Sequence, residues 1–120
     1  PVRQPLAVFV ADGYAAIGDS ACMTIPVIGS GLTNSIMAGK MLADAMLADD
    51  RKTYTVEVLW EYEKQYYKEI GNSCGAFALF KCTMNTFSPE DIIFLIEEEI
   101  LTTDDIYVPY RFAWSYRYAY

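Results

Sequence analysis

Histidine is absent from this 120-residue sequence, and only three cysteines are present. Without histidine, the chain can form neither a Ser-His-Asp triad nor a Cys-His catalytic pair. Cys22, Cys74 and Cys82 form no CxxC pair, which also disfavours a zinc site made from Cys and His ligands. We therefore predict no metal site, and we expect buried free thiols in a reducing compartment rather than a disulfide framework.

Positive charge is also scarce, because 9 Lys and Arg residues face 16 Asp and Glu residues, for a net charge of -7. Nucleic-acid binding needs clustered Lys and Arg, so we expect no nucleic-acid partner. No apolar run approaches the roughly 18–20 residues of a spanning helix, and residues 1–10 show no signal-peptide pattern. We expect a cytoplasmic protein. The first residues, Pro-Val-Arg, read like the middle of a chain, so we expect a piece of a longer protein.

The residues that are present favour one folded, mainly α-helical unit with a short β-hairpin at its N-terminus. Hydrophobic residues make up 53% and charged residues 21% of the sequence, which argues against disorder. Residues 6–10 (LAVFV) and 14–17 are apolar runs on either side of Ala11-Asp12-Gly13, and Asp-Gly in this position indicates a hairpin. The second run ends at Gly18-Asp19, so Asp19 is expected at the end of a strand.

Four helices are predicted after the hairpin. Apolar residues recur with helical spacing over residues 32–47, and a second helix is predicted over 55–70, ended by Gly71-Asn72. A third covers 73–87. Ser88, Pro89 and Asp91 form a strong start for a fourth helix, because a Ser cap, a Pro in the first position and an acid three residues after the cap combine there. It should reach about residue 101. The aromatic tail, residues 107–120, is expected to contact the rest of a larger protein or a second copy of the chain.

The segment 17–46 (IGDSACMTIPVIGSGLTNSIMAGKMLADAM) has features of a ligand loop. A helix that begins near Gly31 presents free N–H groups and a partial positive charge at its first turn. Gly29 and Gly31 carry no side chain that would keep a flat ligand away from the backbone. The Asp19 carboxylate can accept hydrogen bonds from sugar-like hydroxyls. A ribityl flavin would use both features, since its chain carries hydroxyls and its reduced ring carries negative charge.

These residues resemble the second flavin-binding motif of FAD-dependent oxidoreductases of the aromatic-hydroxylase and geranylgeranyl-reductase superfamily. In those families a strand is followed by Gly-Asp-Ala-Ala, a few residues, Pro, two spacer residues, Gly-x-Gly and a helix. Gly18-Asp19-Ser20-Ala21, Pro26, Gly29 and Gly31 match in order and spacing. Gly39 and Leu42-Ala43 resemble the geranylgeranyl-reductase version. Asn34 lies three residues after Gly31, whereas the hydroxylase version has Asn two residues after that glycine.

The resemblance implies roles for individual residues. Gly18 and Asp19 would begin the motif, and Asp19 would bind the ribityl hydroxyls. Pro26 would shape the loop beside the isoalloxazine ring. The ring's pyrimidine edge would lie near Gly29, Gly31 and the backbone amides of Leu32 and Thr33. No catalytic residue is assigned.

The resemblance also implies the fold and function of the whole protein. The chain would be the C-terminal part of an α/β, Rossmann-like FAD-binding flavoprotein, with residues 1–48 completing the FAD-binding domain and residues 49–120 forming a helical region. The parent would use FAD to reduce alkene bonds of an isoprenoid or other apolar small molecule. The N-terminal FAD-binding half would be missing, so this piece alone should not retain FAD and should be inactive. Membrane-peripheral association would follow only from a lipid substrate.

Several alternatives remain open at this stage. The parent could instead be a flavin monooxygenase, or the chain a helical interaction module with a glycine-rich turn. Cys22 could contact flavin, but a buried unreactive thiol is favoured, and Cys74 and Cys82 are expected in the core. Methionines at positions 23, 37, 41 and 46 suit a prenyl cavity or, by preference, plain core. The acidic residues 97–99 and 104–105 are interpreted as a solvated face rather than a cation site.

Overall fold

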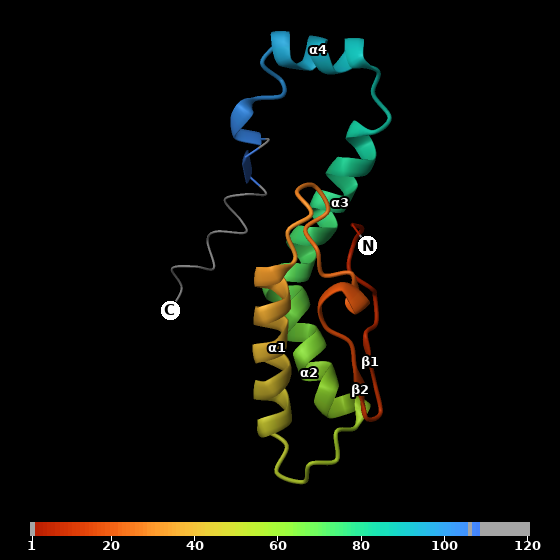
Figure 1. Cartoon of the computed structure of the whole chain (residues 1–120), viewed down its shortest axis with the longest axis vertical. Helices are drawn as coiled ribbons and strands as arrows, with labels where there is room; N and C mark the ends of the chain where they lie inside the picture. Colours follow the sequence, from red (N-terminus) through yellow and green to blue (C-terminus); the bar gives the residue numbers. More distant parts are fainter. Residues whose placement is uncertain (1, 106, 109–120) are drawn as a thin grey trace.

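The computed structural model describes residues 2–105 and 107–108, so most of the aromatic tail lies outside the described residues. The molecule is elongated, with extents of 59 × 29 × 18 Å, and α3 continues upward from the packed base towards α4 (Figure 1). Its elements in chain order are β1 (Val10–Ala11), β2 (Tyr14–Ala15), the 3-10 turn η1 (Gly18–Ala21), α1 (Leu32–Leu47), α2 (Val56–Tyr66), the π-helical η2 (Tyr67–Gly71), α3 (Asn72–Met84) and α4 (Pro89–Glu97).

The predicted hairpin is confirmed, although its strands are shorter than expected. Val10 pairs with Ala15 in an antiparallel register. Gly13, in the connecting turn, has a φ of +67°, which glycine adopts without strain. The turn contacts the start of α2, because the Val56 amide donates to the Asp12 carboxylate at 2.7 Å and the Gly13 amide donates to the Tyr54 carbonyl at 2.9 Å. Long-range hydrogen bonds therefore stabilise a hairpin that would be marginal alone.

Asp19 does not lie at the end of a strand, so this expectation was wrong. The second strand ends at Ala15, and Gly18–Ala21 forms a 3-10 turn instead. The turn is closed by hydrogen bonds from the Cys22 and Met23 amides to the carbonyls of Asp19 and Gly18. Ladder pairing cannot continue where the backbone already bonds to itself in this way.

The first predicted helix is confirmed with its bounds, Leu32–Leu47, and packs alongside α2 (Figure 1). Its buried residues are Asn34, Ala38 and Met41, which are four and three positions apart. This spacing places them on the one helix face that meets the core.

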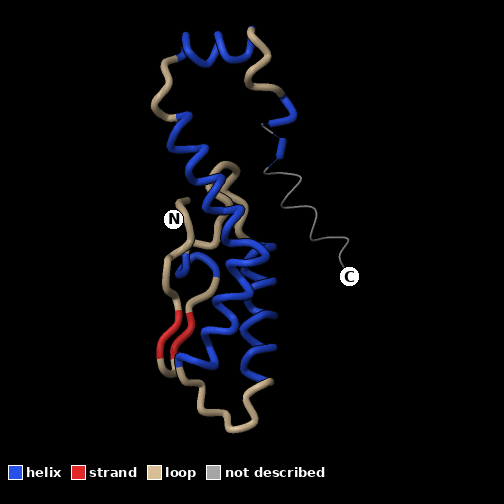
Figure 2. The backbone as a smooth tube through the Cα atoms, turned by 180° about the vertical axis from the view of Figure 1, so that it is seen from behind, coloured by secondary structure: helices blue, strands red, loops and turns tan. Residues whose placement is uncertain are grey.

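The second and third predicted helices exist, but Gly71-Asn72 does not separate them. The backbone stays helical at both residues, with φ and ψ of -60° and -38° at Gly71. The tube drawn in Figure 2 accordingly runs as helix from α2 through η2 into α3. We call this unit, residues 56–84, the helical column.

The π turn keeps one side of the helical column facing the core. Tyr62, Tyr66, Ile70, Cys74 and Ala78 are all buried and lie four residues apart. Residues four apart are not exactly aligned on an α-helix of 3.6 residues per turn, so their side chains gradually turn away from the core. The wider π turn offsets part of this rotation.

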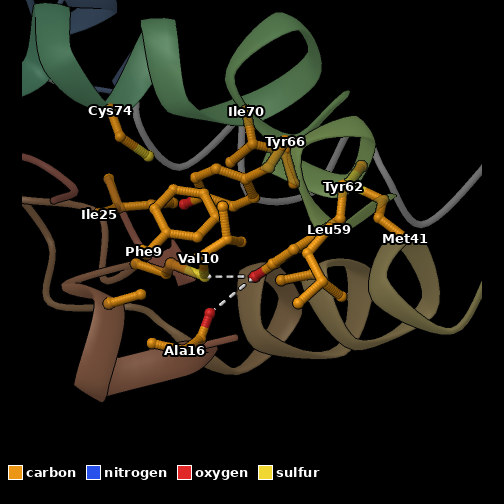
Figure 3. Close-up of a cluster of buried hydrophobic side chains, with 13 residues drawn as sticks. Phe9, Val10, Ala16, Ile25, Met41, Leu59, Tyr62, Tyr66, Ile70 and Cys74 are labelled. Atoms are coloured by element: carbon orange, nitrogen blue, oxygen red, sulfur yellow. Dashed lines mark hydrogen bonds between the residues drawn. The ribbon is translucent and has the colours of Figure 1, made fainter. Parts of the chain in front are cut away.

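The core lies between the hairpin, α1, the helical column and residues 18–31, which we call the Gly-Asp loop (Figure 3). The Phe9 ring meets the Tyr62 and Tyr66 rings edge to face, at centroid distances of 5.3 and 5.6 Å. The Tyr62 hydroxyl donates to the Ala16 carbonyl at 2.9 Å, as the figure shows. Burial, followed by the charge of the neighbouring Glu63, raises the pKa of Tyr62 far above its ordinary value.

The sulfur residues divide between core and surface. Cys22 and Cys74 are buried free thiols as expected, but Cys82 is exposed, so its assignment to the core was wrong. Beyond Ala78 the helical column extends past the packed part of the molecule and covers no further core, which leaves Cys82 at the surface.

The core interpretation suits the methionines: Met23 and Met41 are buried in the cluster, and two others, Met37 and Met46, are partly buried against it.

The fourth helix begins with the predicted capping box, since Ser88 and Asp91 exchange hydrogen bonds between side chain and backbone. It ends at Glu97 rather than near residue 101, because Glu99 has a φ of +55°, which an α-helix does not allow. No residue of α4 is buried. The acidic residues 97–99, 104 and 105 are exposed, and among the described residues no group of His, Cys, Asp or Glu could hold a metal ion.

Within the described part of the chain, no helix combines the length and apolar character needed to cross a membrane. Residues from both predicted regions, 1–48 and 49–120, meet in the same hydrophobic cluster. The division into a cofactor domain and a helical region stays a prediction.

Candidate functional site

The Gly-Asp loop is held in place by apolar side chains that point into the protein. Every residue from 21 to 26 is buried, with Ala21, Met23 and Ile25 fully so, whereas Asp19 is exposed. A second set of backbone hydrogen bonds, from Ile25 to Ser30 and from Gly29 to Ile25, closes the following turn. The loop is therefore fixed from beneath and presents its polar side outward.

This polar side forms a surface groove of about 540 Å³. Four of the seven predicted site residues line it: Asp19, Gly29, Gly31 and Leu32. The remaining lining residues are Val2, Thr24 and Ser35. The groove thus joins one carboxylate, two hydroxyls, two glycines and the start of α1 on one face.

The start of α1 is open at the groove. Gly31 is the N-cap residue and supplies no side-chain hydrogen bond, and the first turn contains no acidic residue. The first N–H groups of an α-helix have no partner within the helix and carry a partial positive charge. The backbone here can therefore donate hydrogen bonds to an electron-rich group in the groove.

The glycines of the loop serve different purposes. Gly29 has a φ of +70°, which would strain any other residue. A side chain added there would meet nothing within 4 Å, so the backbone at Gly29 is open to the groove. A Cβ at Gly31 would lie 2.9 Å from Thr24 Oγ1, and one at Gly18 would lie 3.0 Å from Ser35 Oγ. Gly31 is therefore needed for packing against a hydroxyl group, and Gly18, whose φ is +64°, combines such packing with a left-handed backbone.

The other predicted site residues lie away from the groove surface. Gly18 is buried beneath it, and Thr33 is half-buried in the first turn of α1. Pro26 is fully buried and borders a neighbouring cavity of about 510 Å³, lined largely by α3 residues and the N-terminal segment. Pro26 can shape the loop from below, but it does not line the groove with Asp19.

Three polar residues that sequence reasoning did not assign to the site support the loop. Thr24 Oγ1 donates to Asp19 Oδ1 at 2.9 Å, and Ser35 Oγ donates to the Gly31 carbonyl at 2.7 Å. Asn34, which is 1% exposed, donates from Nδ2 to the Met23 carbonyl at 2.9 Å and to the Cys74 sulfur at 3.5 Å. Of the three, only Thr24 stands out in the sequence, as a polar residue between two apolar neighbours.

Asn34 and Cys74 form the base of the site. Among the described residues, none offers a hydrogen bond to the buried Oδ1 atom of Asn34. Burial raises the pKa of the Cys74 thiol to about 11, and the Asn34 hydrogen bond opposes that rise only in part. The thiol is therefore protonated at neutral pH and is no nucleophile.

The groove fits the part of a flavin that the loop would contact. Gly29 leaves open space where a side chain would stand, and the backbone at the start of α1 can donate towards an electron-rich ring edge. Asp19 supplies an acceptor for hydroxyl groups on the same surface. These are the groups that a ribityl chain and the pyrimidine edge of an isoalloxazine ring require.

Comparison with known proteins points to one class of relatives, the digeranylgeranylglycerophospholipid reductases. No protein-family model matches the chain. Among curated proteins, it is similar to the digeranylgeranylglycerophospholipid reductase of Methanothrix thermoacetophila, with 36% identity over 96 residues, which are 77% of this chain and 24% of the relative.

The same name belongs to a relative from Sulfolobus acidocaldarius, 27% identical over 107 residues, or 88% of this chain and 24% of the relative. Digeranylgeranylglycerophospholipid reductase 1 of Methanococcoides burtonii is 29% identical over 96 residues, or 77% of this chain and 23% of the relative. The resemblance to the geranylgeranyl reductase family is confirmed. The chain spans about a quarter of the length of the curated relatives that it matches.

Proposed function

We propose that the chain is part of a flavin-dependent oxidoreductase that reduces alkene bonds of an isoprenoid or related lipid. The observation that carries the proposal is the groove, in which Asp19, Gly29 and the open start of α1 meet. The relatives support the substrate class through their names, which describe reductases of digeranylgeranylglycerophospholipids. The loop alone would suit other flavoenzymes, and the names of the relatives favour a reductase over a flavin monooxygenase.

In the proposed enzyme, Asp19 would accept hydrogen bonds from ribityl hydroxyls of FAD, and the Leu32 and Thr33 amides would be available to its pyrimidine edge. Bound FAD supplies the hydride equivalents for alkene reduction. The partial positive charge at the start of α1 favours negative charge on the ring and hence the reduced form. Gly29 gives a flat ring access to the backbone, and Pro26 fixes the loop from beneath.

We also propose that the chain is the C-terminal part of an α/β FAD-binding protein and that residues 1–120 alone are inactive. The sequence contains no early strand followed by a Gly-rich dinucleotide motif, so the adenine and pyrophosphate parts of FAD would be bound by other residues. An FAD-dependent reductase activity of the 120-residue chain by itself would refute this point.

The deciding experiment is the absorbance spectrum of the full-length natural polypeptide that carries residues 1–120, purified from cells. We expect the flavin bands of bound FAD, and we expect Asp19→Ala to reduce the flavin content several-fold. Asp50→Ala is a matched control, because Asp50 is an exposed acid outside the groove. A colourless protein that takes up no added FAD would reject the proposal and favour the interaction-module alternative.

A further inference from the structure

Thr24 lies at the bottom of the groove, directly beside the Asp19 carboxylate on which the proposed cofactor site depends. Its side chain is buried, with 6% of the residue exposed, whereas Asp19 is exposed. The Thr24 hydroxyl donates to Asp19 Oδ1 at 2.9 Å. Thr24 also lines the groove together with Asp19 and Gly31. No family pattern stated above assigns a function to this position.

We propose that Thr24 is a positioning residue: it holds the Asp19 carboxylate by Oδ1, so that the other oxygen, Oδ2, accepts the ligand hydroxyl. This inference rests on the proposed function and adds to it. A free carboxylate on an exposed turn samples several orientations, and binding must then order it. A hydrogen bond from a buried hydroxyl orders the carboxylate before the ligand arrives.

Gly31 is the second part of this arrangement. A Cβ at position 31 would lie 2.9 Å from the Thr24 hydroxyl oxygen but 3.5 and 3.6 Å from Thr24 Cα and Cβ. Only the hydroxyl is too close, so glycine at position 31 gives it the space to reach Asp19. Gly31 therefore leaves space for the Thr24 hydroxyl, and the Thr24 hydroxyl in turn holds the Asp19 carboxylate.

The removal of the Thr24 hydroxyl should weaken FAD binding without abolishing it. A single hydrogen bond of this kind, or the ordering of one side chain, corresponds to a change of about 3- to 10-fold in a dissociation constant. This loss of FAD affinity should depend entirely on the Asp19 carboxylate. A variant that lacks the Asp19 carboxylate should therefore be insensitive to the loss of the hydroxyl.

The test is a double-mutant cycle in the full-length natural polypeptide, with FAD as the titrated ligand and apoprotein prepared by removal of flavin. Thr24→Val, which keeps the shape of the side chain but has no hydroxyl, should bind FAD about 3- to 10-fold more weakly. Thr24→Ser should recover most of the affinity. In the Asp19→Ala background, Thr24→Val should change the dissociation constant by less than 2-fold.

The results separate the possible failures. An unchanged affinity of Thr24→Val, or an equal loss in both Asp19 backgrounds, overturns the positioning role while the proposed function stands. A wild-type protein that takes up no FAD overturns both. If Thr24→Val unfolds, Thr24→Ala provides the same comparison, because it also removes the hydroxyl and only shortens the side chain.

Discussion

Glu63 is a charged residue that is buried in the core rather than exposed to solvent. It is 2% exposed, and its Oε2 accepts a hydrogen bond from the Phe9 amide at 2.8 Å. Acidic residues are rarely buried, yet Glu63 lies between the column and the segment that leads into the hairpin. Its charge also contributes to the raised pKa of Tyr67, for which burial is the larger cause.

We predict that Glu63→Leu lowers the free energy of unfolding by about 1–3 kcal/mol, because the buried Phe9 amide would lose its acceptor. Glu63→Gln should cost less than about 1 kcal/mol, since its amide oxygen can accept the same hydrogen bond. Urea unfolding of both variants checks this. A Glu63→Gln variant that is as unstable as Glu63→Leu would show that the negative charge, rather than the hydrogen bond, stabilises the fold.

The buried protonated groups make the fold sensitive to alkali. The pKa of Cys74 rises from 9.0 to about 11 through burial, so the folded protein binds the thiol proton more tightly than the unfolded chain does. Stability from this group is fully present below pH 9 and is lost as the pH rises towards 11. Tyr62 and Tyr67 change in the same direction at higher pH.

We therefore expect the urea midpoint to be constant from pH 7 to 8.5 and to fall between about pH 9 and 11. Cys74→Ala, although less stable throughout, should show a shallower fall in that range. A fall of the same steepness in this variant would assign the effect to other groups. At pH 8, a thiol reagent should modify the exposed Cys82 and leave Cys74 unreacted in the folded protein.

Among the elements, the helical column departs from the local rule that Gly-Asn ends a helix. Gly-Asn after an amphipathic run is a typical helix end, yet the column continues through Gly71 and Asn72. A Cβ at Gly71 would lie 2.7 Å from the Tyr67 ring and 3.1 Å from the Tyr66 ring. Glycine is therefore present to accommodate two aromatic side chains, and this tertiary reason cannot be read from a window of neighbouring residues.

We predict opposite effects for two glycines of the column. Gly71→Ala should destabilise by about 1–3 kcal/mol, because the added methyl group forces the Tyr67 ring to move. Gly75→Ala should stabilise by about 0.5–1 kcal/mol, because a Cβ there meets nothing within 4 Å and alanine favours a helix. Thermal unfolding of both variants gives the answer. Stabilisation by Gly71→Ala would mean that the ring moves at no cost.

The elements differ in how far the sequence alone predicts them. The bounds of α1 and the capping box of α4 follow from local patterns, and both are confirmed. The Gly-Asp motif identified the groove residues Asp19, Gly29, Gly31 and Leu32, whose cofactor contacts stay predictions. Thr24 was missed because its role depends on a hydrogen bond across the 3-10 turn, which spacing does not reveal.

For the molecule as a whole, buried residues are distributed unevenly along its long axis. The hydrophobic cluster includes the hairpin, the Gly-Asp loop, α1 and most of the helical column. No residue of α4 is buried, while Ile93, Phe94 and Ile96 are more than half exposed. Since the curated relatives are about four times as long as the matched region, a larger polypeptide would have ample surface to cover these side chains.

This uneven burial means that no single free energy of unfolding describes the chain. In native-state hydrogen exchange, amides of α2 and η2 should exchange only through global unfolding, with rates that rise steeply with added denaturant. Amides of α4 should exchange through local opening, orders of magnitude faster and almost independently of denaturant. Equal protection of α4 in the 120-residue chain would contradict this. The Gly-Asp loop is buried in the same cluster as α2 and η2 and should exchange as slowly, so the groove should keep its shape while α4 opens and closes many times.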